Sequence, residues 1–506
     1  HIEITGVSDE IIGMYGSTLA PFANSGNITL NAKGIGAYFI DTDVANSGNV
    51  TVNAADGYGM YFKGGDSAST GTVTATGSSS VGVIVTKAGS SFTNNAGGII
   101  NSGGTSSIGV YAENGATFTN TGTLNSTLSG GSIGAFAKGS AIENTGTISS
   151  HYLGLYGKDA STINYTSGIM TINSGVGILA DGGASTVNLN GGSITGTAAG
   201  TTSVVGKNTG IINLNGTNIS QTGAGTIGIV LDNGSSVLTG GNISVGAGGT
   251  GLYAENSTVT LSGYGGSITM GNQGIALYSK DSALSSGTLN VNYTNTAKGV
   301  GIYYEGTNSV MNNITVNHTG DNLVSIFADG ISLTNTAAQT INDDGIGVYG
   351  DNGAVVSNQG TLTLNGDDTI GIYLDGAASQ ITNIGTIAGT PSTVGNKIGV
   401  YVNSGDITGN TAYNFNIDGG IGIYLKNNDI SYTGTMTVAG DSNSVNRTIG
   451  IYVDPSITGT LGTNINITGE NAIGIYLAEN SGVAANITYN GELNITSAST
   501  ADRGIG

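Results

Sequence analysis

The stretch Ile346-Gly347-Val348-Tyr349 is one copy of the phrase that decides the fold of this chain. An aliphatic residue, a tiny residue, another apolar residue and usually tyrosine recur in this order twenty times within 506 residues. The tiny residue stands at positions 13, 36, 59, 82, 109, 134, 154, 177, 203, 228, 251, 276, 301, 325, 347, 371, 399, 422, 450 and 474. The 19 intervals span 461 residues, so the mean period is about 24 residues, which is typical of a solenoid.

One period holds three short strand-like segments. In the copy that begins at Ile346 they are residues 346–349, 354–358 and 361–365, and Gly, Asn and Asp separate them. No segment has helical spacing long enough for a crossover helix, so each strand must pair with its equivalent one rung away. We therefore predict an all-β fold, a right-handed parallel β-helix (β-solenoid) of about 20 rungs of about 24 residues, with three short strands per rung.

An Asn-x-Gly sequence follows the tiny residue in many rungs. The pairs are Asn24/Gly26, Asn46/Gly48, Asn120/Gly122, Asn144/Gly146, Asn358/Gly360 and Asn383/Gly385. Amides stacked one rung apart can hydrogen-bond along the column, and we expect the glycine to supply a positive φ at the corner. The alternative is that these residues reflect turn preference alone.

The tyrosine of the phrase predicts an outward aromatic column. Strand alternation places Ile473, Ile475 and Leu477 in the core, so Gly474 and Tyr476 are expected to point outward. No rung has a polar side chain at the tyrosine position, which is unusual for an exposed strand. Two interpretations remain open. The rings stack on one another and shield the backbone, or they form an extended surface for a partner or a glycan.

A charged column lies four residues past the tiny position. It comprises Lys63, Lys138, Lys158, Lys207, Lys280 and Lys426 with Glu113, Asp181, Asp232, Glu255, Glu305, Asp329, Asp351, Asp375 and Asp454. A second acidic column, four residues before the tiny position, begins with Asp321, Asp343 and Asp367 and continues at Asp418 and Glu470, and Asp344 and Asp368 widen it. Solvated turns are the simplest interpretation. Because like charges one rung apart repel, the alternatives are a calcium site at Asp321, Asp343 and Asp367, or a basic partner.

Composition excludes some function classes. The net charge of −20 argues against nucleic-acid binding, and the absence of Cys excludes thiol and disulfide chemistry. His1, His151 and His318 are scattered over different rungs and predict no metal set. We find no signal peptide and no apolar run near 20 residues. We expect residues 1–506 to form one continuous β-helix cut from a longer protein, with no cofactor other than the possible Ca²⁺.

The segments Asn144 to Ile148 and Asn383 to Ile387, together with the recurring Ile-Gly-Ile-Tyr motif, resemble the passenger regions of type V secreted adhesins. The pattern of sequence repeats is most similar to that of the very large fusobacterial autotransporter adhesins, and the resemblance covers essentially the whole chain. It implies display at the bacterial outer-membrane surface through a C-terminal membrane barrel that lies outside this segment. It also implies binding to a host-cell protein or glycan receptor, or to a partner bacterium. No binding residue carries over by position.

We therefore expect a non-enzymatic adhesin segment, and two alternatives stay open: a structural stalk, or a polysaccharide-cleaving β-helix enzyme. If the segment binds directly, the candidate partner-binding residues are Tyr303, Phe327, Tyr349 and Tyr373 with Glu305, Asp329, Asp351 and Asp375. Aromatic faces beside carboxylates suit cationic groups such as guanidinium.

Overall fold

The computed structural model describes residues 1–5, 11–18, 20–127, 131–293, 296–307, 310–311, 313–389, 396–409, 412–417, 419–426, 430–440, 447–455, 457–469, 471–480 and 483–496. Its contacts divide the chain into two compact units. Unit 1 comprises residues 1–259 and 264–266, and unit 2 comprises residues 260–263 and 267–506. Every described element is a strand, and in each unit the chain passes through three parallel sheets in turn. The predicted parallel β-solenoid is confirmed, with about 19 turns of about 24 residues.

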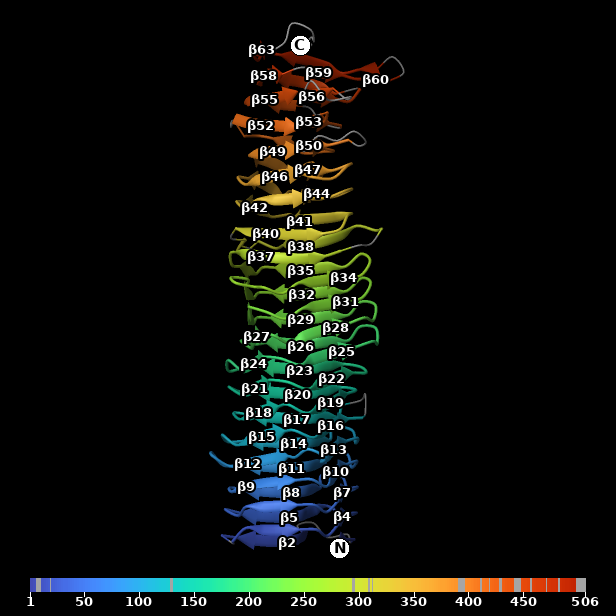
Figure 1. The fold of residues 1–506 in the computed structure, drawn as a ribbon, viewed down its shortest axis with the longest axis vertical. Coiled ribbons are helices and arrows are strands. Elements are labelled where there is room, and N and C mark those ends of the chain that lie inside the picture. Colours follow the sequence, from blue (N-terminus) through green and yellow to red (C-terminus); the bar gives the residue numbers. More distant parts are fainter. Residues whose placement is uncertain are drawn as a thin grey trace. The chain divides into compact units, whose positions relative to one another are not determined.

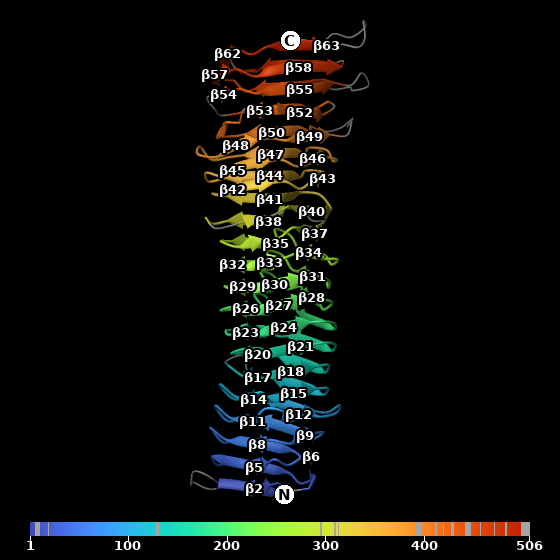
Figure 2. The ribbon, with the colours of Figure 1, turned by 90° about the vertical axis from the view of Figure 1, so that its left-hand side faces the viewer.

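In unit 1 the first sheet carries the phrase, the second follows the charged column, and the third follows the Asn-x-Gly corner (Figures 1 and 2). The first sheet comprises β2 (Ile11–Ser17), β5 (Gly34–Ile40), β8 (Tyr58–Lys63), β11 (Val81–Thr86), β14 (Ile108–Glu113), β17 (Ile133–Lys138), β20 (Leu153–Lys158), β23 (Val176–Asp181), β26 (Thr202–Lys207), β29 (Ile227–Asp232) and β32 (Thr250–Glu255). The second comprises β3 (Phe22–Asn24), β6 (Val44–Asn46), β9 (Asp66–Ser69), β12 (Ser91–Asn94), β15 (Thr117–Asn120), β18 (Ala141–Asn144), β21 (Thr162–Tyr165), β24 (Thr186–Leu189), β27 (Ile211–Leu214) and β30 (Ser235–Leu238). The third comprises β1 (Ile2–Ile4), β4 (Ile28–Leu30), β7 (Val50–Val52), β10 (Thr72–Ala75), β13 (Ile99–Ser102), β16 (Thr123–Ser126), β19 (Thr147–Ser150), β22 (Ile169–Ile172), β25 (Ser193–Gly196), β28 (Asn218–Gln221) and β31 (Ile243–Val245).

Unit 2 repeats this order, and β33 (Thr258–Thr260) contains the boundary between the units. Its phrase strands are β35 (Ile275–Lys280), β38 (Gly299–Glu305), β41 (Leu323–Asp329), β44 (Ile346–Asp351), β47 (Ile370–Leu374), β50 (Ile398–Val402), β53 (Ile421–Leu425), β56 (Thr448–Val453) and β59 (Ala472–Leu477). The strands after the charged column are β36 (Ala283–Leu284), β39 (Val310–Met311), β42 (Ser332–Asn335), β45 (Val355–Asn358), β48 (Gln380–Asn383), β51 (Asp406–Ile407), β54 (Ile430–Tyr432), β57 (Thr458–Leu461) and β62 (Asn486–Tyr489). The strands after the corner are β34 (Ile268–Met270), β37 (Gly287–Asn292), β40 (Ile314–Thr319), β43 (Gln339–Ile341), β46 (Thr361–Leu364), β49 (Thr386–Gly389), β52 (Ala412–Ile417), β55 (Thr435–Gly440), β58 (Asn464–Gly469) and β63 (Leu493–Thr496). An antiparallel pair, β60 (Glu479–Asn480) and β61 (Val483–Ala484), departs from the rung pattern.

The phrase strands do not alternate strictly between inward and outward side chains. Our expectation that the tiny residue points outward is therefore wrong. In β14, Gly109 and Val110 are both buried, whereas Ile108 and Tyr111 on either side are half-buried. A Cβ on Gly109 would meet the core side chain of Ile100 at 3.0 Å. The tiny residue therefore faces inward with the residue after it, and the first aliphatic residue faces outward. The same correction holds for Gly474, which is buried, and a Cβ added there would meet side chains of β58 and β63. The expected core positions of Ile473 and Leu477 are wrong, because Ile473 is half-buried and Leu477 is exposed.

The predicted asparagine ladder is confirmed. Asn94 donates to Asn120 and Asn120 donates to Asn144, each at 2.8 Å, and all three side chains are buried. In unit 2, Asn335 donates to Asn358 at 2.7 Å. Asn144 and Asn358 also donate to the carbonyl oxygens of Gly146 and Gly360, so these side chains satisfy buried backbone groups at the corner.

The role that we expected for the corner glycines is wrong in most rungs. Of the six glycines, only Gly385 has a positive φ, of 68°. Gly48, Gly122, Gly146 and Gly360 are needed instead because the backbones of successive rungs touch at the corner, whereas Gly26 has room for a Cβ. A Cβ on Gly146 would lie 2.2 Å from the carbonyl oxygen of Gly122, and a Cβ on Gly48 would lie 2.1 Å from that of Gly26.

Candidate functional site

The aromatic side chains of the phrase form an outward column in each unit. Register pairing places Tyr303 beside Phe327, Phe327 beside Tyr349, and Tyr349 beside Tyr373. All four are half-buried, while the residues on either side of each ring in the strand are buried. The candidate aromatic residues are therefore brought together on the outer face of unit 2, as the sequence predicts.

In unit 2 the rings stack in one uninterrupted series. From Tyr278 to Tyr476, neighbouring centroids lie 4.6–5.2 Å apart and neighbouring planes differ by 6–17°. Each interior ring thus has both faces covered by its neighbours, and it offers its edge and its hydroxyl to solvent. A cation cannot lie over the face of an interior ring, so the guanidinium–ring contact that the sequence suggested is not the contact that we propose.

The column of unit 1 is less regular. Tyr38 and Tyr61 meet edge to face at 78°, and Tyr111 and Phe136 are tilted by 46°. Aliphatic residues replace the ring at Ile84, Leu179, Val205 and Val230. A continuous ring series within one unit is therefore a feature of unit 2.

The charged column runs beside the rings and is bonded to them. The Tyr303 hydroxyl donates to Asp329 and the Tyr278 hydroxyl donates to Glu305, each at 2.5 Å and each to the next rung. In unit 1, Tyr156 donates to Asp181 at 3.0 Å. The phenols and carboxylates thus form one connected outer surface instead of two independent columns.

A third set of residues, which the sequence interpretation missed, holds the carboxylates in place. Asn352 has a positive φ of 52° and donates through its side chain to Asp329 at 2.7 Å. Asn208 has a φ of 50° and donates to Asp181 at 2.8 Å in the same way. The sequence feature that could have revealed this set is an Asn or Asp directly after the charged position, because these residues tolerate left-handed backbone and reach neighbouring acceptors.

The four candidate acids are half-buried on successive rungs, and their nearest cations stand at the ends of the row. Partial burial raises the pKa of Asp375, but hydrogen bonds from Ser404, Gly376 and Asn403 and the charge of Lys426 outweigh it, so its pKa is lowered. Asp351 accepts a hydrogen bond from the Asn352 backbone N–H at 2.6 Å. Asp375 is thereby stabilised in its ionised form, and the row places four acidic side chains on successive rungs of the outer surface.

The same environment makes the tyrosines weaker acids. Partial burial and the adjacent Glu113 raise the pKa of Tyr111 to about 12, and partial burial and the bond to Asp181 raise the pKa of Tyr156 to about 12. In unit 2, partial burial followed by the bond to Asp329 raises the pKa of Tyr303.

These shifts predict loss of stability at alkaline pH. A raised pKa means that the folded state favours the neutral phenol, so its contribution is complete below pH 10 and is lost as pH rises toward 12. We expect absorbance at 295 nm to show a late-titrating group of tyrosines, and far-UV circular dichroism to fall over the same range. Tyr111→Phe keeps the ring and should remove one late phenol and part of the alkaline loss. Titration of all tyrosines near pH 10 in the folded chain would contradict this.

The acids proposed for calcium lie in the turn that leads to the phrase strand. Asp321 and Asp343 are exposed and Asp367 is half-buried. The structure brings Asp343 and Asp367 side by side, and the Asp343 carboxylate accepts the Asp367 backbone N–H at 2.8 Å. Among the described residues, no group of three or more acidic, histidine or cysteine side chains converges well enough to hold a metal ion. The Asp343 carboxylate thus has a structural role between rungs.

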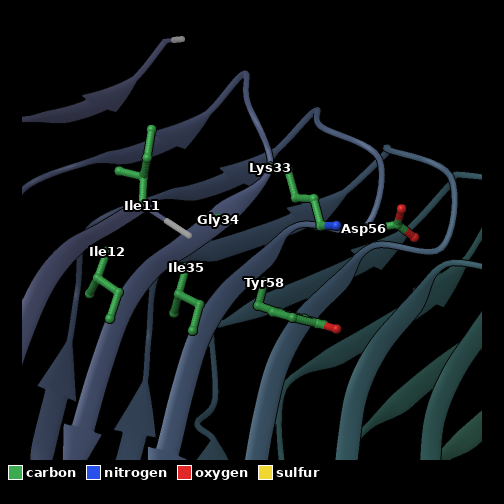
Figure 3. Close-up of a pocket in the computed structure, with 7 residues that line it drawn as sticks. All are labelled: Ile11, Ile12, Lys33, Gly34, Ile35, Asp56 and Tyr58. Carbon is green, nitrogen blue, oxygen red and sulfur yellow. The ribbon is translucent and has the colours of Figure 1, made fainter. Parts of the chain in front are cut away.

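An apolar hollow of about 210 Å³ lies on the first sheet of unit 1. Figure 3 shows Ile12, Ile35 and Tyr58 side by side on β2, β5 and β8, with Lys33 and Asp56 at its edge. Ile12 is 44% exposed. The hollow is independent confirmation that the first residue of the phrase faces outward.

No protein-family model matches this chain, and no curated protein sequence matches it. No helix in the described ranges has the length and apolar character needed to cross a bilayer. The architecture itself, a parallel β-solenoid, is compatible with a β-helix passenger domain.

Proposed function

We propose that this chain is a non-enzymatic attachment segment of a cell-surface adhesin of the autotransporter type. Its solenoid presents an extended outer surface to a host-cell protein or glycan receptor, or to a partner bacterium. The observation that carries the proposal is the row of Glu305, Asp329, Asp351 and Asp375 beside the stacked rings of unit 2.

The row has the chemistry of a binding surface for basic groups. Four carboxylates at strand spacing, about 4.8 Å, repel one another, and only Lys280 and Lys426 of the same column stand near its ends. A partner that brings ammonium or guanidinium groups relieves this repulsion and makes charge-assisted hydrogen bonds. The rings below the row are locked by stacking, so the carboxylates are held in place before the partner arrives.

The test is direct binding of the purified chain. We expect fluorescent beads coated with the chain to attach to a subset of host cells, bacteria or immobilised glycans, and soluble chain to compete for the same sites. Binding should weaken as NaCl rises, because charge contacts are screened. Beads coated with a protein of similar negative charge and another fold are the control. If only the control-level signal is seen on every surface, the attachment proposal is wrong. Release of reducing sugar from a glycan would instead support the enzyme alternative.

A further inference from the structure

The third sheet of unit 1 has an outer face without charge. From β4 to β31 its strands contain no Asp, Glu, Lys or Arg. Between residues 67 and 254 the charged side chains are Lys87, Glu113, Lys138, Glu143, Lys158, Asp159, Asp181, Lys207 and Asp232. All of them except Glu143 lie at the corner between the first and second sheets. In a three-sided solenoid that corner is opposite the third sheet.

The outward side chains of this face form two ranks that follow the strand register. The first rank is Thr72, Ile99, Thr123, Thr147, Ile169, Ser193 and Asn218. The second rank, two residues later in each strand, is Thr29, Thr51, Thr74, Asn101, Asn125, Ser149, Thr171, Thr195, Ser220 and Ser244. Every member of the second rank is a small hydroxyl or amide side chain. Asn125 donates to Asn101 at 2.9 Å, which fixes part of the rank in place.

Two exposed isoleucines interrupt the first rank. Ile99 is 36% exposed and Ile169 is 54% exposed, and the register puts Thr123 and Thr147 between them. The arrangement is symmetric about the midpoint between β16 and β19. A two-fold axis through that midpoint, perpendicular to the strand stack, would bring Ile99 of one copy against Ile169 of a second copy.

We propose that this charge-free face is a homotypic interface, on which two copies of the chain pair antiparallel through the third sheets of their unit 1 segments. The charge distribution is the main argument for a second copy. A chain with a net charge of −20 resists self-association through most of its surface. For residues 67–254, pairing through this face leaves the charged corner behind a sheet layer of about 10 Å, which exceeds the Debye length of about 8 Å at physiological salt. Nearer the N-terminal end, Lys33 and Asp56 lie at the edge between the third and first sheets and carry opposite charges.

The size of the face and its composition agree with a second copy of the chain as the occupant. Ten strands at about 4.8 Å, and two ranks with a combined width of about 12 Å, offer about 500 Å² per copy, close to the lower limit for a specific interface. Polar ladders of Thr, Ser and Asn can pack flat against identical ladders. A neutral glycan is a poorer fit, because this face has no aromatic side chain on which a sugar ring could lie.

Sedimentation velocity on the purified chain tests the pairing. We expect a reversible monomer–dimer equilibrium in the micromolar range that strengthens as NaCl is raised, because salt screens the repulsion between the two acidic copies. The double variant Thr123→Asp with Thr147→Asp places four carboxylates around the axis and should weaken dimerisation at least about tenfold. The matched control, Thr93→Asp with Thr119→Asp, puts the same charges on adjacent rungs of the second sheet and should leave dimerisation unchanged.

A charge-reversal experiment shows whether the face meets itself. Thr123→Lys with Thr147→Lys should also be monomeric alone, and a mixture of the Asp and Lys variants should recover a one-to-one dimer. A chain that stays monomeric at all concentrations, or a dimer that these variants do not weaken, overturns the proposal. A mixture that fails to pair also overturns it. If the Asp pair instead abolishes binding to an immobilised glycan while the chain stays monomeric, the face serves another partner and the homotypic proposal is wrong.

Discussion

A single methyl group on Gly146 is expected to destabilise unit 1 by about 3 kcal/mol or more. The Cβ of Gly146→Ala would lie 2.2 Å from the Gly122 carbonyl oxygen and 2.8 Å from the Asn120 amide nitrogen. Neither atom can move without breaking the corner, because the Asn120 amide is bonded to Asn144. The damage should be local, since each rung of a solenoid contacts only its neighbours. Hydrogen exchange should therefore show lost protection in β15, β18 and the strands beside them.

Gly265→Ala is the matched control for this prediction. Gly265 also lies in unit 1, its φ is not positive, and the nearest atom to a Cβ would be the Thr239 carbonyl oxygen at an ordinary 3.8 Å. We expect its urea midpoint to stay unchanged or to rise slightly, because alanine restricts the unfolded chain. Equal midpoints for the two variants would show that the corner backbones are not in close contact.

Much of the fold could be predicted from the sequence because a solenoid repeats one local problem. The rung that begins at Ile346 was predicted as strands 346–349, 354–358 and 361–365, and it forms β44, β45 and β46 within two residues at each end. The asparagine ladder was also predictable, since a side chain that recurs every rung must stack on its own copies.

The inward turn of the tiny residue could not be predicted in the same way. Strict alternation assumes that every residue advances the strand by one pleat, and the phrase breaks this rule at Gly109, where two successive residues face the core. The register pairs Ile108 and Val110 with the next rung and passes over Gly109. A Cβ at position 109 would lie 2.4 Å from the Gly134 carbonyl oxygen one rung away, a steric limit between rungs that no single period of the sequence reveals.

The candidate site, too, could be predicted from the sequence only in part. The columns of rings and charges follow from the period alone, and the structure confirms both sets in register. Whether the rings turn their faces or their edges to solvent depends on side-chain rotamers, and identical positions stack at 9° in Tyr349 and Tyr373 but cross at 78° in Tyr38 and Tyr61. The orientation of the rings was therefore beyond the sequence, although the position of the two columns was not.

Neutralising the acidic row of unit 2 is expected to reduce attachment to a basic partner at least about tenfold. The variant combines Glu305→Gln, Asp329→Asn, Asp351→Asn and Asp375→Asn. Asp375→Asn keeps an oxygen that can accept from Ser404, and Asp329→Asn keeps one of the two oxygens that now accept from Tyr303 and Asn352, so the solenoid should persist. What is lost is the run of successive negative charges, and with it the salt dependence of binding.

A matched variant in unit 1 separates location from total charge. Glu113→Gln, Asp181→Asn, Asp232→Asn and Glu255→Gln remove the same number of charges from the same column, where lysines stand among the acids. Both variants should keep the far-UV spectrum and the melting temperature of the parent chain. Bead attachment and surface plasmon resonance at 0.05 and 0.5 M NaCl would then compare the three proteins. Equal losses in both variants would point to net charge alone, and full binding by the unit 2 variant would remove the acidic row from the attachment surface.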